Sequence, residues 1–237
     1  MTTHTFGQFD IDINELRQEM LKMLKLARRN TKQAINALLN SDIEKAERVI
    51  ASDGIINALE VDIDRKARLM VVHHQPVASD LRFVFTTLKI TTDIERISDL
   101  ASCIARVAKE SPDVSSANEV MVMKPLILNM FRMIRRAIVQ SDAELASQVI
   151  TYDYNLNNSC HTVDRALHSF IMEDPSRTTE CFKIAGVSKR IERIGDHLKH
   201  IAQMVIYLTK GQEVRHVNPQ ELEQFLAEED DDDDDIE

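Results

Sequence analysis

Apolar residues recur every three to four positions along most of the chain, with polar residues between them. This spacing places the apolar side chains on one face of an α-helix. The pattern predicts long helices over residues 13–39, 43–72, 78–108, 117–139, 142–172 and from about 177 to 208, and a short one near 219–226. Residues that cap or break helices separate them: Asn40-Ser41-Asp42, Pro76, Pro112, Ser141-Asp142 and Pro175.

The helical pattern occurs twice. Residues 37–70, moved by 100 positions onto residues 137–170, match at eleven of 34 positions. Beyond the next turn the offset becomes 97, because the loop in the second half is three residues shorter. The sequence therefore predicts an all-α fold of two tandem three-helix bundles related by internal duplication, over residues 13–110 and 117–211. The polar stretch 111–116 is the predicted linker.

Composition supports this fold and limits the classes of function. Five glycines, five prolines, no tryptophan and 5% aromatic residues leave little material for a β-rich fold. Residues 228–237 carry nine negative charges, so a net charge of −10 leaves only −1 for the rest of the chain. A nearly neutral body argues against nucleic-acid binding. Residues 227–237 are predicted to be a disordered acidic tail.

Other features favour a cytoplasmic protein without catalytic machinery. The three cysteines form no Cys-x-x-Cys pair, which argues against a disulfide framework or a thiolate zinc site. No apolar run approaches the roughly 18 residues that a membrane span needs, so contact with a membrane is expected only through partners. The sequence contains no glycine-rich phosphate loop and no Ser-His-Asp order typical of hydrolases.

One acidic motif is present in both halves. The pattern Ile-Glu-Arg-Ile-x-Asp occupies residues 94–99 and again residues 191–196. A helix places its Glu and Asp on the same face, so Glu95 lies beside Asp99 and Glu192 beside Asp196. Like charges at this spacing repel by a few tenths of a kcal/mol. We therefore expect a cation, a nearby arginine or a basic partner to offset this repulsion.

The duplication adds a second acidic helix to each half, carrying Asp53 with Asn57 and Asp153 with Asn157. Antiparallel packing would bring these side chains opposite the Glu and Asp of the motif. Candidate ions are Fe, Zn, Mg, Ca or Mn. Oxygen ligands suit Fe, Mg, Ca and Mn better than they suit zinc in a closed tetrahedral site. The alternative is a solvated face on which Arg96, Arg193 and their neighbours neutralise these carboxylates. His197 and His200 are further candidate ligands, or simply solvated polar residues.

Several motifs together resemble the PhoU family: Val49-Ile50-x-x-Asp53, Pro76-x-Ala78-Ser79-Asp80-Leu81-Arg82, both acidic motifs, and Lys210-Gly211-Gln212-x-x-Arg215-His216-Val217. The resemblance implies two three-helix repeats in a cytoplasmic homodimer that is not an enzyme. It further implies a negative regulator of the phosphate-starvation response. Such an adaptor links the ATPase subunit of the phosphate ABC transporter to a sensor histidine kinase and modulates phosphate uptake.

The resemblance also bears on metal binding. Some family members bind metal clusters on these motifs, which correspond here to Glu95, Asp99, Glu192 and Asp196, with Asp53 and Asp153 as the facing positions. Two departures make the halves unequal, because Asp93 and Ser98 correspond to Arg190 and Gly195 in the second half. We expect the first half to be the better cation site. The alternatives are a carboxylate-bridged metal-binding protein or metalloenzyme, and a phosphate sensor that uses Arg132, Arg135 and Arg136.

Overall fold

The structure is a computed structural model that describes residues 3–111, 114–215, 217 and 222. Those residues form six α-helices, two 3-10 helices and no strand. The α-helices are α1 (Thr3–Leu39), α2 (Ile43–His74), α3 (Ala78–Glu110), α4 (Met123–Gln140), α5 (Ala143–Glu173) and α6 (Thr178–Lys210). The 3-10 helices are η1 (Ser115–Val122) and η2 (Pro175–Arg177). The predicted short helix near 219–226 and the acidic tail lie outside the described residues, apart from Leu222.

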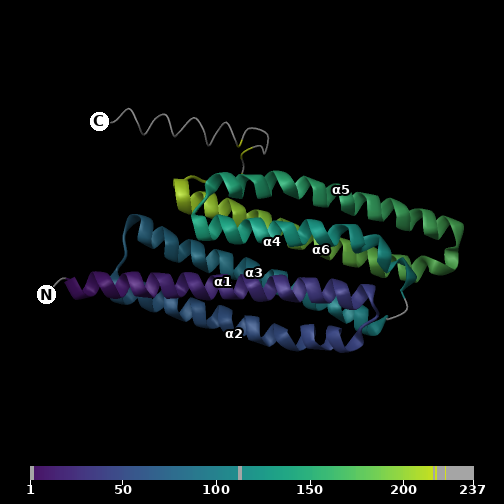
Figure 1. Cartoon of the computed structure of the whole chain (residues 1–237), viewed down its shortest axis with the longest axis horizontal. Helices are drawn as coiled ribbons and strands as arrows, with labels where there is room; N and C mark the ends of the chain where they lie inside the picture. Colours follow the sequence, from purple (N-terminus) through teal and green to yellow (C-terminus); the bar gives the residue numbers. More distant parts are fainter. Residues whose placement is uncertain (1–2, 112–113, 216, 218–221, 223–237) are drawn as a thin grey trace.

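The helices form two bundles that lie side by side along their length (Figure 1). Helices α1, α2 and α3 pack together, as do α4, α5 and α6, and the bundles meet where α3 packs against α6 and α1 against α4. Lys183 donates to Ser111 at 2.7 Å, and Arg82 lies over the ring of Tyr207. Because these contacts join opposite ends of the two helices, α3 and α6 are antiparallel. The prediction of two three-helix bundles is confirmed.

The duplicated turns have the same structure. Asp42 accepts a hydrogen bond from the backbone N–H of Lys45 at 2.8 Å, and Asp142 accepts one from Leu145 at 2.8 Å. The serine before each aspartate has a φ of 51°. Both aspartates therefore cap the next helix as the sequence predicted, since they satisfy backbone donors that have no partner within the helix.

Two helix boundaries differ from the sequence prediction. Helix α1 begins at Thr3 and not near residue 13, and the added turns carry Phe9 onto the core. The helix predicted over 117–139 is divided into η1 and α4. Pro125 explains the division, because it has no N–H to donate to the carbonyl of Met121 and its ring crowds that carbonyl. Met123 instead donates to the carbonyl of Val120, in the shorter 3-10 pattern.

The core is continuous across the two bundles, although a polar linker joins them in the sequence. Helices α3 and α6 form its centre, where Ile94, Ile97, Ile191 and Ile194 are fully buried. Among the described helices, none is long and apolar enough to cross a membrane.

Candidate functional site

The first acidic face lies where α2 and α3 pack together. Glu95 of α3 is about one-sixth exposed, with 17% of its side-chain area accessible. Burial raises the pKa of Glu95, and the nearby carboxylates of Asp99, Glu60 and Asp53 raise it further. Its one described ion pair is a long contact of 3.7 Å with Arg96, whose side chain is 63% exposed. The first face therefore holds carboxylates that repel one another with little compensation.

The second acidic face, on α5 and α6, is neutralised from within. Lys189 donates to Glu192 at 2.5 Å, and the thiol of Cys160 donates to the same oxygen at 3.2 Å. Burial alone would raise the pKa of Glu192, but these two hydrogen bonds outweigh it and lower the pKa. Asp196 is exposed on the same helix. The neutralising cation is thus Lys189 and not Arg193, which has no ion pair among the described residues.

The facing aspartates differ because of one substitution between the repeats. In the first half, Ser98 donates a hydrogen bond to Asp53 at 3.1 Å. In the second half, Gly195 replaces the serine, and a Cβ there would lie 2.4 Å from a methyl carbon of Leu156. A side chain at this position would therefore force buried Leu156 to move, so the close packing of α5 on α6 favours glycine.

Asp153, the counterpart of Asp53, is 1% exposed. One of its oxygens has no hydrogen-bond partner among the described residues, while the other accepts from Asn157 at 3.2 Å and Lys199 at 3.4 Å. Burial raises its pKa, and the charge of Lys199 opposes that shift. Asp153 is a buried, partly compensated carboxylate and not an open ligand.

The donor set of both faces consists of oxygens that suit hard cations. In the described part of the chain, however, no group of three or more His, Cys, Asp or Glu side chains gathers closely enough to hold one metal ion. The arrangement of these side chains does not fit a preformed metal centre. Metal binding at Asp53, Glu95, Asp99, Asp153, Glu192 and Asp196 stays a prediction.

The two histidines have a different role from metal binding in this structure. His197 and His200 of α6 both donate through Nδ1 to Asp93 of α3, at 2.9 and 2.6 Å. Burial alone would raise the pKa of Asp93. The two hydrogen bonds from the histidines outweigh burial and lower that pKa. The sequence carried a signal for this contact, because Asp93 shares the helical spacing of the buried Ile90 and Ile97.

Two motifs of the family resemblance meet at one end of the molecule. Arg82, from the Pro-x-Ala-Ser-Asp-Leu-Arg turn, lies over the ring of Tyr207, with its guanidinium carbon 5.9 Å from the ring centre. The same side chain lies against Gly211, where a Cβ would be 2.3 Å from Nη1. Gly211 has a φ of 81° and ends α6. These residues join the start of α3 to the end of α6.

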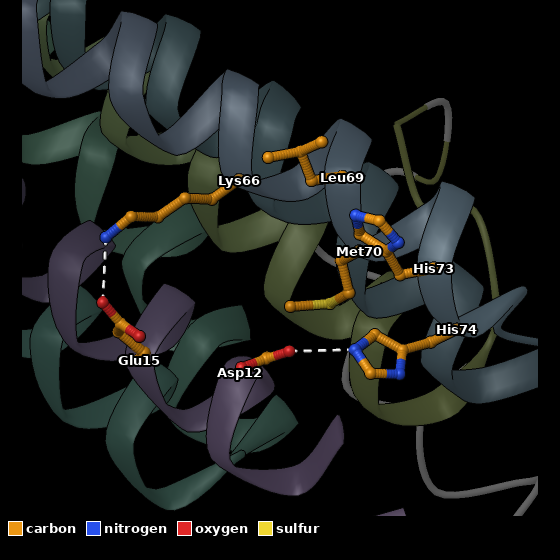
Figure 2. Close-up of a pocket in the computed structure, with 7 residues that line it drawn as sticks. All are labelled: Asp12, Glu15, Lys66, Leu69, Met70, His73 and His74. Carbon is orange, nitrogen blue, oxygen red and sulfur yellow. Dashed lines mark hydrogen bonds and ion pairs between the residues drawn. The ribbon is translucent and has the colours of Figure 1, made fainter. Parts of the chain in front are cut away.

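A separate pocket lies between the beginning of α1 and the end of α2 (Figure 2). Asp12 pairs with His74 at 2.9 Å, and Glu15 pairs with Lys66 at 2.9 Å. Lys66 also pairs with Glu19. No motif or spacing in the sequence predicted this pocket. Because its charges largely pair with one another, it joins two helices and offers little to a charged ligand.

Comparison with known proteins decides the family. The sequence model of the PhoU domain matches residues 20–108 and again residues 120–205. The chain belongs to the PhoU family. The PhoU homolog of Burkholderia sp is 31% identical over 93% of this chain and 97% of its own. The homolog of Pseudomonas aeruginosa is 34% identical over 92% of this chain and 91% of its own. Escherichia coli PhoU is 30% identical over 96% of this chain and 95% of its own.

Solved PhoU structures have the same fold. The crystal structure of Pseudomonas aeruginosa PhoU superposes with a TM-score of 0.82 at 33% identity, over 86% of this chain and all of that one. The crystal structure of the phosphate transport system regulatory protein PhoU from Streptococcus pneumoniae superposes with a TM-score of 0.81 at 25% identity. The match covers 87% of this chain and 99% of that one. These family members are named as accessory and regulatory proteins and not as enzymes.

Proposed function

We propose that this chain is a cytoplasmic adaptor that negatively regulates the phosphate-starvation response and modulates phosphate uptake. It docks on the ATPase subunit of the phosphate ABC transporter and on a sensor histidine kinase, and it lowers phosphate-starvation signalling when phosphate is plentiful. The observation that carries the proposal is the match, over more than nine-tenths of the chain, to relatives named phosphate-specific transport system accessory proteins. The family resemblance suggests that the working form is a homodimer.

The first acidic face is the better candidate for docking. Glu95 has little compensation from neighbouring cations, and three nearby carboxylates raise its pKa. A basic partner would relieve that repulsion on binding. The second face offers less, because Lys189 and Lys199 already occupy its carboxylates. Like charges held together without a counterion cost stability, so their presence supports a role in binding.

The regulatory role is tested by deleting the gene in cells grown with abundant phosphate. Loss of a negative regulator should derepress phosphate-starvation genes, and unchanged expression would contradict the proposal. Docking is tested by co-purification of the transporter ATPase and the kinase with the tagged chain. The variant Glu95→Gln with Asp99→Asn should lose partner binding, because it removes both charges of the motif and conserves side-chain size.

A matched variant controls for charge alone. Glu44→Gln with Glu47→Gln also removes two carboxylates, but from surface ion pairs at the start of α2. Such pairs contribute little to stability, so this control should fold and bind normally. Equal loss of binding in both variants would show that net charge matters and not the acidic face. The variant Glu192→Gln with Asp196→Asn measures the contribution of the second face.

Cation binding at the first face is a second candidate function, favoured by the mutual repulsion around Glu95. Asp53, Glu95 and Asp99 would hold the ion, and a bound cation would offset their repulsion. Titration calorimetry with Mn²⁺ tests this directly. Heat that is lost in Glu95→Gln with Asp99→Asn supports a cation site, whereas no heat with the wild-type chain rejects it.

A further inference from the structure

Two segments of the chain contain basic residues and no acidic ones. Residues 20–41 contain five lysines and arginines without a single Asp or Glu, and residues 120–141 contain four. These cations are Lys22, Lys25, Arg28, Arg29, Lys32, Lys124, Arg132, Arg135 and Arg136. Because the chain without residues 228–237 is nearly neutral, the two segments concentrate a local positive charge that overall composition conceals.

The fold places these two segments against each other. The first segment is the later half of α1 and the second is mainly α4, and these helices pack together at the junction of the bundles (Figure 1). Between them lies a groove of about 710 Å³. Four of the cations line it: Arg28, Lys32, Lys124 and Arg132. Leu128 and Tyr152 add apolar and aromatic surface.

The groove cations have no carboxylate partners. In the part of the chain that the structure describes, none of these four residues forms an ion pair, and Arg132 donates only to the side-chain oxygen of Asn129 at 3.1 Å. By contrast, Lys66 contacts three carboxylates. The groove thus differs from the self-neutralised pocket at the other end of α1. Its positive charge is therefore not offset by carboxylates of the described residues.

We propose that the basic groove, defined by Arg28, Lys32, Lys124 and Arg132, binds the acidic run Glu228–Glu237 of the same chain. That run carries nine negative charges, and four of the nine cations of the two basic segments line the groove. Complementary charge of this density gives attraction that weakens with added salt. The bound run would cover the groove and exclude other acidic ligands.

The chain is long enough to make this contact. Arg17 lies over the ring of Phe83, next to Arg82, which packs on Gly211, so α6 ends near the level of Arg17. Arg28 lies eleven residues further along α1, or about 16 Å at 1.5 Å per residue. Residues 212–227, which join the end of α6 to the acidic run, span up to roughly 55 Å when extended. Their length exceeds this distance even after the width of a helix or two is added.

Zero-length cross-linking of the wild-type chain tests the proposal. A carbodiimide joins a lysine amine to a carboxylate in contact with it, and mass spectrometry identifies the joined peptides. We expect Lys32 and Lys124 to be joined to residues 228–237, with a yield that falls as salt is raised. Lys183, an exposed lysine on α6, is the internal control and should be joined rarely. Equal cross-linking of all three lysines would overturn the proposal.

A double charge reversal removes positive charge from the groove and keeps Lys32 and Lys124, the two lysines that report the contact. In Arg28→Glu with Arg132→Glu, the cross-links of Lys32 and Lys124 to residues 228–237 should fall about tenfold. The matched control, Arg106→Glu with Arg165→Glu, alters two exposed arginines elsewhere and should leave the yield unchanged. An equal fall in both variants would show that total charge is responsible and not the groove.

Isotope labelling identifies the occupant. In an equal mixture of ¹⁵N-labelled and unlabelled chains, contact within one chain gives cross-links of a single isotope, as we expect. Mixed-isotope products would instead assign the groove to a second copy. If cross-links to residues 228–237 are absent and the chain binds phosphatidylglycerol vesicles through Arg28 and Arg132, the groove is a lipid-binding surface. Either outcome rejects the proposed contact.

Discussion

Asp93 of α3 and His200 of α6 form a hydrogen bond of 2.6 Å between the two bundles. The contact joins residues that are 107 positions apart. Its aspartate belongs to the first repeat alone, because Arg190 occupies the corresponding position of the second. The duplication has therefore diverged where the two halves meet, and a polar contact specific to one repeat helps to set how the bundles pack.

The stability that this contact contributes should depend on pH. The hydrogen bond to Asp93 raises the pKa of His200 above its ordinary value of 6.5, so its stabilisation is full below that pH and is lost as pH rises through the raised pKa. Because the pKa of Asp93 is lowered, its contribution to stability is full above pH 3.8, the ordinary pKa of an aspartate. That contribution is lost as pH falls through the lowered pKa. The contact should therefore stabilise the folded chain most between about pH 3.8 and pH 6.5.

The variant Asp93→Asn tests this prediction. At pH 5.5 it should unfold more easily than the wild type by about 1 kcal/mol, since His200 is more than one-third exposed and its partner charge is partly screened. A chain of this size should then lose about 2–4 °C in Tm. The difference should shrink at pH 8. Thermal unfolding followed by circular dichroism measures both, and equal differences at the two pH values would contradict the mechanism.

Gly195→Ala should destabilise the fold by about 1–3 kcal/mol, because the new methyl group would meet buried Leu156 and the carboxylate of Asp153. Gly54→Ala is the matched control, since a Cβ there meets nothing within 4 Å. Alanine favours the helix interior, so the control should be stabilised by up to about 1 kcal/mol. Urea denaturation should show shifts of opposite sign, and shifts of the same sign would refute the packing argument.

Glu95→Gln should leave the chain as stable as the wild type or more stable at pH 7. The pKa of Glu95 is raised by burial and by neighbouring carboxylates, so its ionised form opposes folding and stability rises as pH falls through that pKa. Removing the charge should stabilise the fold by a few tenths of a kcal/mol. Chemical denaturation at pH 7 measures the change. A clear loss of stability would show that Glu95 makes a favourable contact.

The cysteines should react unequally with thiol reagents in the native chain. Burial raises the pKa of Cys160 to about 11, and its side chain is 3% exposed. Little thiolate is then present at pH 8, so Cys160 should be unreactive. Cys103 is partly exposed and should be modified first. Alkylation followed by mass spectrometry should find Cys160 labelled only after denaturation, and rapid native labelling would contradict its burial.

The sequence predicted most of the fold, since helical spacing and caps depend on nearby residues and the duplication is visible when the two halves are aligned. Asp42 and Asp142 cap the helices that the pattern predicted. The division between η1 and α4 was missed, although its cause, Pro125, was visible in the sequence. The acidic motifs were also found from spacing, because residues four apart share a helix face.

The sequence by itself determined the helices, their duplication and the carboxylates of each motif. Only the tertiary structure decided which carboxylates have partners. Glu192 accepts a hydrogen bond from Cys160 of another helix, Glu95 has no such bond among the described residues, and Asp93 reaches the histidines of the other bundle. The physical reason is that burial and charge depend on side chains brought together from distant parts of the chain, and helical periodicity does not record those contacts.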